Sequence, residues 1–238
     1  MKQNEVFHRL YYFTEEQHAY KNILNREIKI STFDALNDSH EFKNIDTSGK
    51  SQRPLRRSID NLIKKTGEVK GLICLSKCWR SPLMWGYYAN RGQGVCLGFD
   101  VPNFPGADAI VTPIKYTKTK ISLDELDLKN NPYEVMDNLL HTKFIDWKHE
   151  KEMRMIVAKS TCEEREGLWF SKFDNTLILK EVYLGDKCPK SVSDYEKLIS
   201  ETNYTSTVQV KQTRPAFGRY EYTVSESVPQ GELLATNT

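Results

Sequence analysis

The sequence predicts a single α+β domain, and three observations support this expectation. Segments with strand-like alternation are interleaved with segments of helical spacing along 238 residues. The chain shows no internal repeat and no linker that would divide it. Its 39% hydrophobic and 11% aromatic content is that of a globular protein with a sizeable core. We expect residues 1–224 to form the domain and the polar, aperiodic residues 225–238 to form a disordered tail.

The predicted elements alternate along the chain. We expect strands at residues 10–13, 27–31, 71–76, 95–100, 109–116, 150–158, 177–184 and 207–212, with 220–222 pairing to the last of them. Helical spacing predicts helices at 15–25, 54–65, 132–144 and 191–201, and Ser81 followed by Pro82 predicts the start of a short helix. Thr14 is the expected N-cap of the first helix, and we expect loops at 43–53, 101–108 and 160–166.

Composition limits the class of protein. The net charge of +2 points to no particular partner. No apolar run reaches the roughly 18 residues that a membrane span needs, and the first residues lack a signal-peptide core. Five scattered cysteines predict reduced thiols and a cytoplasmic location. Cys74 and Cys78 have no second Cys/His pair at zinc-site spacing, so we expect no metal.

The segment from Glu150 to Ala158 carries an unusual charge pattern. In a strand, Glu150, Glu152 and Arg154 fall on one face, and the opposite face is apolar from Met153 onward. Two carboxylates placed two residues apart destabilise a strand unless a nearby group offsets them. Either Arg154 provides that offset as a salt bridge, or the face lines a cleft.

A basic segment precedes the third predicted strand. Its helical spacing is compatible with a solvated amphipathic helix, and its charge is compatible with a surface that contacts nucleic-acid phosphates. The residues that would make those phosphate contacts are Arg53, Arg56, Arg57, Lys64 and Lys65.

Paired carboxylates and aromatic side chains suit glycosidic chemistry. One carboxylate stabilises an oxocarbenium-like cation and the other activates the attacking group. Breakage of the nicotinamide–ribose bond of NAD is such a reaction. It requires aromatic walls, polar groups for the ribose and phosphates, and a glutamate near the ribose 2′-hydroxyl. The sequence offers Tyr12, Trp85 and Tyr88 for the first, Ser31 and Arg80 for the second, and Glu152 for the third. For Trp85, packing in the core is an equally open alternative.

Three motifs in residues 9–158 resemble a widespread bacterial family labelled as a domain of unknown function. They are Leu10-Tyr11-Tyr12-Phe13-Thr14 with Leu36-Asn37-Asp38, Trp85-x-x-Tyr88-Ala89 with Gly94-Val95-Cys96-x-x-Phe99, and Lys143-x-x-x-Trp147-x-x-Glu150-x-Glu152-x-Arg154. Their order also resembles the ADP-ribosyltransferase superfamily. That resemblance implies a split, twisted, mainly antiparallel sheet flanked by helices.

The resemblance implies roles for individual residues. Tyr12 takes the position of the superfamily's first-strand His or Arg, from which it departs, and His8 or Arg9 is a substitute. Tyr88 takes the middle position and Glu152 the late-strand glutamate. These roles place the two tyrosines at nicotinamide, Glu152 at the ribose 2′-hydroxyl, Glu150 at the acceptor, and Arg154 at the glutamate pair or a phosphate.

The implied function is that of an NAD-dependent mono-ADP-ribosyltransferase without a metal. Small bacterial members of the superfamily often act as toxins or anti-phage effectors, so an antitoxin partner and an RNA, DNA or protein acceptor are expected. The basic segment favours nucleic acid. Two alternatives stay open, namely a nuclease that uses Glu150 and Glu152, and a binding module without catalysis.

Overall fold

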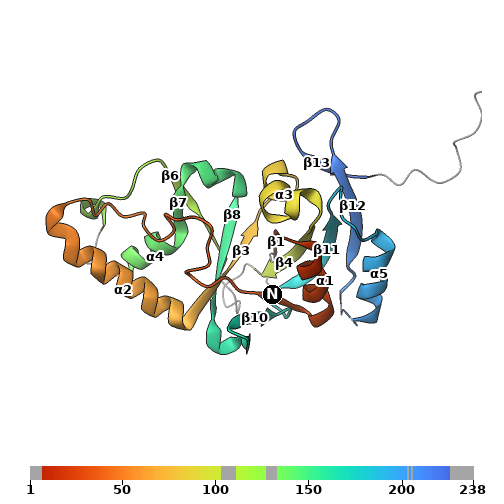
Figure 1. Ribbon diagram of the computed structural model, residues 1–238, viewed down its shortest axis with the longest axis horizontal. Helices are drawn as coiled ribbons and strands as arrows, with labels where there is room; N and C mark the ends of the chain where they lie inside the picture. The colour runs from red at the N-terminus through yellow and green to blue at the C-terminus, as the bar shows by residue number, and fades with distance from the viewer. Residues whose placement is uncertain (1–6, 103–110, 127–132, 203, 205, 226–238) are drawn as a thin grey trace, which may run out of the picture.

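The protein has a mixed α+β architecture built on one large, curled sheet (Figure 1). The computed structural model describes residues 7–102, 111–126, 133–202, 204 and 206–225. Most of the tail expected from residue 225 onward lies outside the described residues. None of the described helices is both long enough and apolar enough to cross a membrane.

Eight strands form the main sheet. In spatial order they are β13 (Tyr222–Val224), β12 (Gln209–Pro215), β11 (Ile178–Leu184), β4 (Val95–Pro102), β1 (Phe7–Thr14), β3 (Lys70–Ser76), β8 (Glu152–Ala158) and β5 (Val111–Pro113). Every neighbouring pair is antiparallel except β11 and β12, which are parallel. The crossover between these two strands contains α5 (Val192–Glu201), as a parallel connection requires. The expected mainly antiparallel sheet is therefore present.

The sheet is split between β1 and β3. β1 pairs with β4 over its full length, from Phe7 to Thr14, but meets β3 only where Tyr11 lies opposite Ser76. The start of β3 is bonded instead by an isolated bridge from Ser31 to Leu72. Two halves therefore diverge from a single contact, and the opening between them is where the candidate site lies.

Two helices cover the larger half of the sheet. α1 (Glu16–Asn25) buries Ala19 and Ile23, and α5 buries Tyr195 and Leu198. The helices contact each other through Tyr20 and Tyr195, whose ring centroids are 6.4 Å apart. Both lie at the same end of the molecule in Figure 1. The main core forms between these helices and the apolar face of the sheet.

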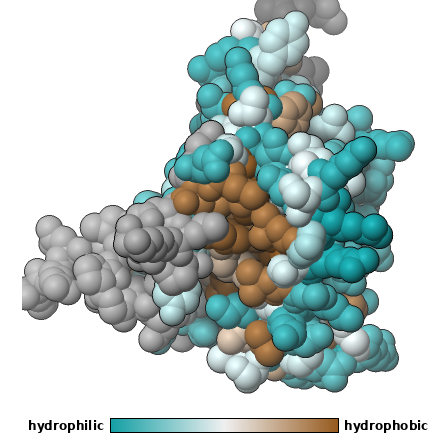
Figure 2. All heavy atoms as spheres, turned by 90° about the vertical axis from the view of Figure 1, so that its left-hand side faces the viewer, coloured by the Kyte–Doolittle hydropathy of each residue, from teal (hydrophilic) through white to brown (hydrophobic). Residues whose placement is uncertain are grey.

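A separate apolar cluster lies at the opposite end, around α2 (Arg53–Val69) and α4 (Glu134–His141). Its buried members are Ile45, Ile59, Ile121, Leu126 and Leu139. Figure 2 views this end directly and shows apolar side chains gathered in one area bordered by hydrophilic ones.

The remaining elements are short. They are α3 (Pro82–Tyr88), the three-stranded sheet β2 (Glu27–Lys29), β10 (Leu168–Lys172) and β9 (Glu163–Arg165), and the pair β6 (Lys115–Thr117) and β7 (Thr142–Phe144). Five 3₁₀ turns are described: η1 (Lys50–Gln52), η2 (Asn90–Gly92), η3 (Leu123–Glu125), η4 (Ile145–Glu150) and η5 (Lys159–Thr161).

Several predicted boundaries are wrong. The helix expected to reach residue 144 ends at His141, because the Asn44 side chain and Arg154 bond its last carbonyls and the chain then extends as β7. The loop expected at 160–166 contains η5 and β9 instead. The segment expected as a loop at 43–53 ends in η1 and the start of α2. Thr14 belongs to β1, and Glu15 is the N-cap residue of α1.

Two predicted strands begin or divide differently. The chain from 111 to 117 forms β5 and β6 rather than one strand, and residues 109 and 110 lie outside the described part. The strand expected from Glu150 begins at Glu152, because Lys151 adopts a left-handed backbone with φ of 47° that ends η4.

Trp85 provides a test of the packing in this half of the fold. It is completely buried, its indole N–H donates to the carbonyl of Trp79 at 2.7 Å, and its ring stacks on Tyr222. Trp85→Ala should lower the free energy of unfolding by about 3–5 kcal/mol because it leaves a large cavity. Urea denaturation measures this loss. Tyr87→Ala, on the exposed side of the same helix, should change it by less than about 0.5 kcal/mol, and equal losses in the two variants would contradict this account.

Candidate functional site

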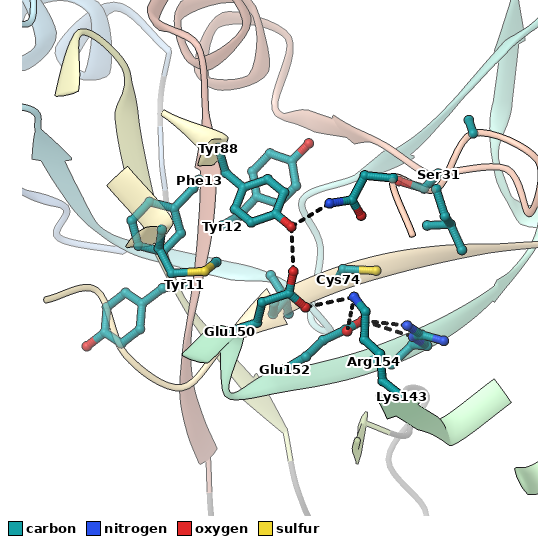
Figure 3. A pocket seen from close by; sticks show the side chains of 15 residues that line it. Tyr11, Tyr12, Phe13, Ser31, Cys74, Tyr88, Lys143, Glu150, Glu152 and Arg154 are labelled. Atoms are coloured by element: carbon teal, nitrogen blue, oxygen red, sulfur yellow. Dashed lines mark hydrogen bonds and ion pairs between the residues drawn. The ribbon is translucent and has the colours of Figure 1, made fainter. Parts of the chain in front are cut away.

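A cavity of about 220 Å³ occupies the split in the sheet (Figure 3). It receives side chains from β1, β3, α3, β7, η4 and β8, and from the segment after β2. Its lining residues are Tyr11, Tyr12, Phe13, Ser31, Ala35, Leu36, Asn37, Cys74, Leu75, Met84, Tyr88, Lys143, Glu150, Glu152 and Arg154. The cavity thus combines apolar and aromatic walls with a charged floor.

Glu150 reaches the cavity from the end of η4 rather than from the strand. The turn at Lys151 redirects the chain, so that Glu150 and Glu152 approach from different backbone directions. The Ser76 hydroxyl fixes this turn by donating to the Glu150 carbonyl at 2.6 Å, and the Lys77 N–H donates to the Lys151 carbonyl at 3.0 Å. The two carboxylates therefore converge although they do not share a strand face.

Glu152 is the first residue of β8 and lies opposite Ser76 in the pairing with β3. Its backbone N–H donates to the Tyr116 hydroxyl at 2.8 Å. Its carboxylate accepts from Arg154 Nε at 2.9 Å and from Lys143 Nζ at 3.3 Å. Both partners are buried, so water screens these contacts little.

Five charged side chains form one buried network. Lys143 Nζ lies 2.7 Å from Glu150 Oε2 and 3.8 Å from Glu41 Oε2, and Arg154 donates to Glu41 Oε1 at 2.9 Å. All five members, including Glu152, are less than 10% exposed. Three carboxylates face two cations, so the network carries one net negative charge when every member is ionised. Such a network is stable only while each charge keeps its partners.

Burial and pairing act in opposite directions on these groups. Burial alone would raise the pKa of Glu152, but Arg154 and Lys143 outweigh it and lower that pKa. Burial dominates at Glu41, whose pKa is raised despite Arg154. For the two cations, burial lowers the pKa, and the neighbouring carboxylates more than reverse it, so that the pKa values of Lys143 and Arg154 are raised. Both cations therefore stay charged at neutral pH.

Tyr88 connects the aromatic wall to the carboxylates. Its hydroxyl donates a short hydrogen bond to Glu150 and accepts one from Asn37 Nδ2 at 2.7 Å (Figure 3). Burial, followed by the bond to Glu150, raises the pKa of Tyr88, so it remains a neutral donor. Tyr12 also lines the cavity, and burial raises its pKa to about 12.

The structure brings together six of the predicted site residues, namely Tyr12, Ser31, Tyr88, Glu150, Glu152 and Arg154. It does not bring Trp85 or Arg9 into the cavity. Trp85 lies in the core, because α3 directs it against Phe13 and Tyr222. Arg9 forms ion pairs with Asp100 at 2.7 Å and with Glu181 at 2.6 Å. Arg80, also proposed from the sequence, packs over the Trp79 ring outside the cavity.

Sequence reasoning missed Glu41 and gave Lys143 no role. Glu41 stands in a segment without periodicity, and nothing in the pattern relates it to β8, which follows more than 100 residues later. Lys143 was part of a motif, but its position as the cation between Glu150 and Glu152 depends on the turn at Lys151.

The predicted nucleic-acid contacts lie on α2. Arg53, Arg57, Lys64 and Lys65 are exposed, whereas Arg56 is half-buried and donates to the carbonyls of Thr47 and Gly49. The described positions are compatible with either of the two interpretations of this segment, so phosphate contact stays a prediction.

Among the residues that the structure describes, no group of three or more His, Cys, Asp or Glu side chains is placed to hold a metal ion. The three buried carboxylates of the network do not form such a group, because Lys143 and Arg154 lie between them.

Residues 84–155 match the model of a family described as a protein of unknown function (DUF2971). The match covers less than a third of the chain but runs from α3 into β8, and so contains Tyr88, Lys143, Glu150, Glu152 and Arg154. No curated protein matches the sequence. No solved structure matches it either.

The buried network makes Arg154 critical for stability. Arg154→Met should lower the free energy of unfolding by about 3–5 kcal/mol, because Glu41 and Glu152 stay buried without their cation. Arg219→Met removes a surface ion pair with Glu221 and should cost less than about 1 kcal/mol. Chemical denaturation of both variants measures the difference, and similar small losses would show that the network does not stabilise the fold.

The lowered pKa of Glu152 predicts acid sensitivity. A carboxylate with a depressed folded pKa contributes stability above its unfolded pKa of about 4.3, and that stability is lost as the pH falls through the folded pKa. The stability advantage of the wild type over Glu152→Gln should therefore shrink between pH 7 and pH 3 in urea titrations. Glu196→Gln, at an exposed helix position, serves as the control. An advantage that is constant with pH would contradict the expectation.

Proposed function

We propose that this protein is an NAD-dependent mono-ADP-ribosyltransferase that modifies a macromolecule, with nucleic acid favoured over protein. One observation carries the proposal. Two carboxylates and two tyrosines from four separate segments line one cavity in the split of the sheet. They are Glu150, Glu152, Tyr12 and Tyr88. This combination of groups matches what cleavage of the nicotinamide–ribose bond requires.

The cavity suits one end of NAD rather than the whole molecule. Its volume of about 220 Å³ is below the roughly 300–1,000 Å³ of typical ligand pockets. Nicotinamide and its ribose would enter between Tyr12 and Tyr88, and the rest of the dinucleotide would lie outside. Ser31 lines the same cavity and offers a hydroxyl to the ribose.

In the proposed step, the bond between C1′ and the nicotinamide nitrogen breaks, and its electron pair stays on nitrogen and neutralises the pyridinium. A lone pair of the acceptor forms the new bond to C1′. Glu152 accepts a hydrogen bond from the ribose 2′-hydroxyl and stabilises the cationic carbon. Glu150 receives the proton that the acceptor loses.

The neighbouring cations support this division of roles. Glu152 forms ion pairs with two cations, Lys143 and Arg154. Its lowered pKa keeps it ionised, so that its negative charge can stabilise the oxocarbenium-like cation. Glu150 contacts one cation, Lys143, and the neutral donor Tyr88. Its negative charge therefore has fewer cationic partners than that of Glu152, which suits a group that has to take a proton. Arg154 acts in this scheme as a tether for Glu152 rather than as a phosphate ligand, because Glu41 and Glu152 already occupy it.

A transferase of this kind in a bacterial cytoplasm would act as a toxin or anti-phage effector and would require an antitoxin partner. This biological role rests on the resemblance to the superfamily. It is tested by comparing the growth of cells that express the wild type with that of cells that express Glu152→Gln.

The proposed activity is tested by incubating the protein with NAD labelled on the adenylate and with separate RNA, DNA and protein fractions. Wild-type protein should transfer label to one fraction, and Glu152→Gln should reduce transfer by at least about a hundredfold. Glu181→Gln is a matched control, because Glu181 is also a β-strand glutamate paired with an arginine but lies outside the cavity.

Other outcomes assign the site differently. Cleaved nucleic acid without transfer or NAD hydrolysis would favour the nuclease. That reaction needs a further carboxylate and a lysine, which Glu41 and Lys143 supply, whereas the exposed Lys151 does not. Harmless expression, together with an unchanged phenotype in Glu152→Gln, would favour a binding module.

A further inference from the structure

A second cavity, of about 340 Å³, shares Lys143 with the candidate site. We call it the lysine groove. Its lining residues are Asp38, His40, Lys43, Asn44, Thr117, Lys118, Thr119, Lys120, Thr142, Lys143, Phe144 and Trp147. Neither the sequence motifs nor the proposed function gives this groove a role.

The groove offers aromatic surface beside the carboxylates. Phe144 and Trp147 belong to β7 and η4, in the same short segment that contributes Lys143 and Glu150 to the candidate site. Phe144 is 46% exposed, and Trp147 is half-buried with its ring centroid 4.9 Å from Lys143 Nζ. Rings held in this way present flat faces on which a base can stack.

The groove is also positively charged. Lys43, Lys118 and Lys120 are exposed along it. Among the described lining residues Asp38 is the only carboxylate, and it accepts a hydrogen bond from the His40 backbone N–H. In the described part of the chain, no carboxylate forms an ion pair with Lys118 or Lys120. Hydrogen bonds from Ser48 lower the pKa of the Asp46 carboxyl, and Lys120, which lies near it, helps to lower that pKa. Exposed cations next to aromatic rings are the combination that single-stranded nucleic acids bind.

The groove continues toward the basic helix. Lys43 and Lys120 also line an adjoining cavity of about 270 Å³, to which Arg56 of α2 contributes. Cationic side chains therefore extend from Arg56, whose cavity Asp60 also lines, through the lysine groove to Lys143 and the two candidate catalytic glutamates. This continuity joins the predicted basic surface to the candidate site, which the sequence alone could not do.

We propose that the lysine groove binds a single-stranded polynucleotide, with a base stacked on Trp147 and the phosphates held by Lys43, Lys118 and Lys120. A single strand fits better than a duplex, because stacking on Trp147 requires a base face that a duplex keeps covered. Delivery of the adjoining nucleotide to Glu150 rests on the proposed transferase function, whereas binding of the strand does not.

Binding is tested by fluorescence anisotropy without NAD, using labelled single-stranded RNA and DNA of roughly 12 nucleotides and matched duplexes. Single strands should bind more tightly than duplexes. Trp147→Ala should weaken binding about tenfold, and Trp147→Phe should restore most of it. Lys118→Ala with Lys120→Ala should reduce the slope of log affinity against log salt by about two. Lys21→Ala with Lys197→Ala, on the exposed surfaces of α1 and α5, should match the wild type.

The proposal is overturned if no oligonucleotide binds, or if Trp147→Ala binds as the wild type does. It is also overturned if AMP competes fully with the strand and AMP binding itself requires Trp147, since the groove would then hold the adenylate of NAD. Glu152→Gln should bind strands normally. Strand binding that persists without any label transfer would count against the transferase and leave the groove assignment intact.

Discussion

A buried ion network borders the split in the sheet and joins the elements on its β8 side. β1 and β3 are paired in register at a single residue pair, so strand pairing contributes little to holding this part of the molecule together. Arg154 instead joins β8 to Glu41 and to the carbonyl of Leu140 at the end of α4. Lys143 joins the segment after α4 to both glutamates. Charged side chains thus hold together the elements on the β8 side of the split, and the Tyr88 hydroxyl of α3 connects to them through Glu150.

This arrangement connects stability to chemistry. A carboxylate buried beside two cations is kept ionised and oriented, which the proposed transferase step would require of Glu152. The same contacts limit how the site can vary, because removal of either cation leaves buried negative charge. Lys143 also borders both the candidate site and the lysine groove, so the two cavities lie next to each other.

The strand and helix periodicity was sufficient to predict most elements. Alternation at residues 10–13, 71–76 and 95–100 corresponds to β1, β3 and β4, which are the central strands of the sheet. The errors occur where side chains from elsewhere decide the backbone. Asn44 and Arg154 end α4 by bonding its carbonyls, and the left-handed turn at Lys151 separates Glu150 from the strand. Local propensity contains no information about such distant partners.

For the site, the sequence by itself determined the residue types and their order, so that Tyr12, Tyr88, Glu150 and Glu152 could be selected as a group. Only the tertiary structure decided which residues meet. It placed Trp85 in the core rather than at the cavity, because one side of the short helix α3 packs against β1 and β13. It also brought in Glu41, more than 100 residues from β8, because the balance of a buried charge network depends on distances in space and not on separation along the chain.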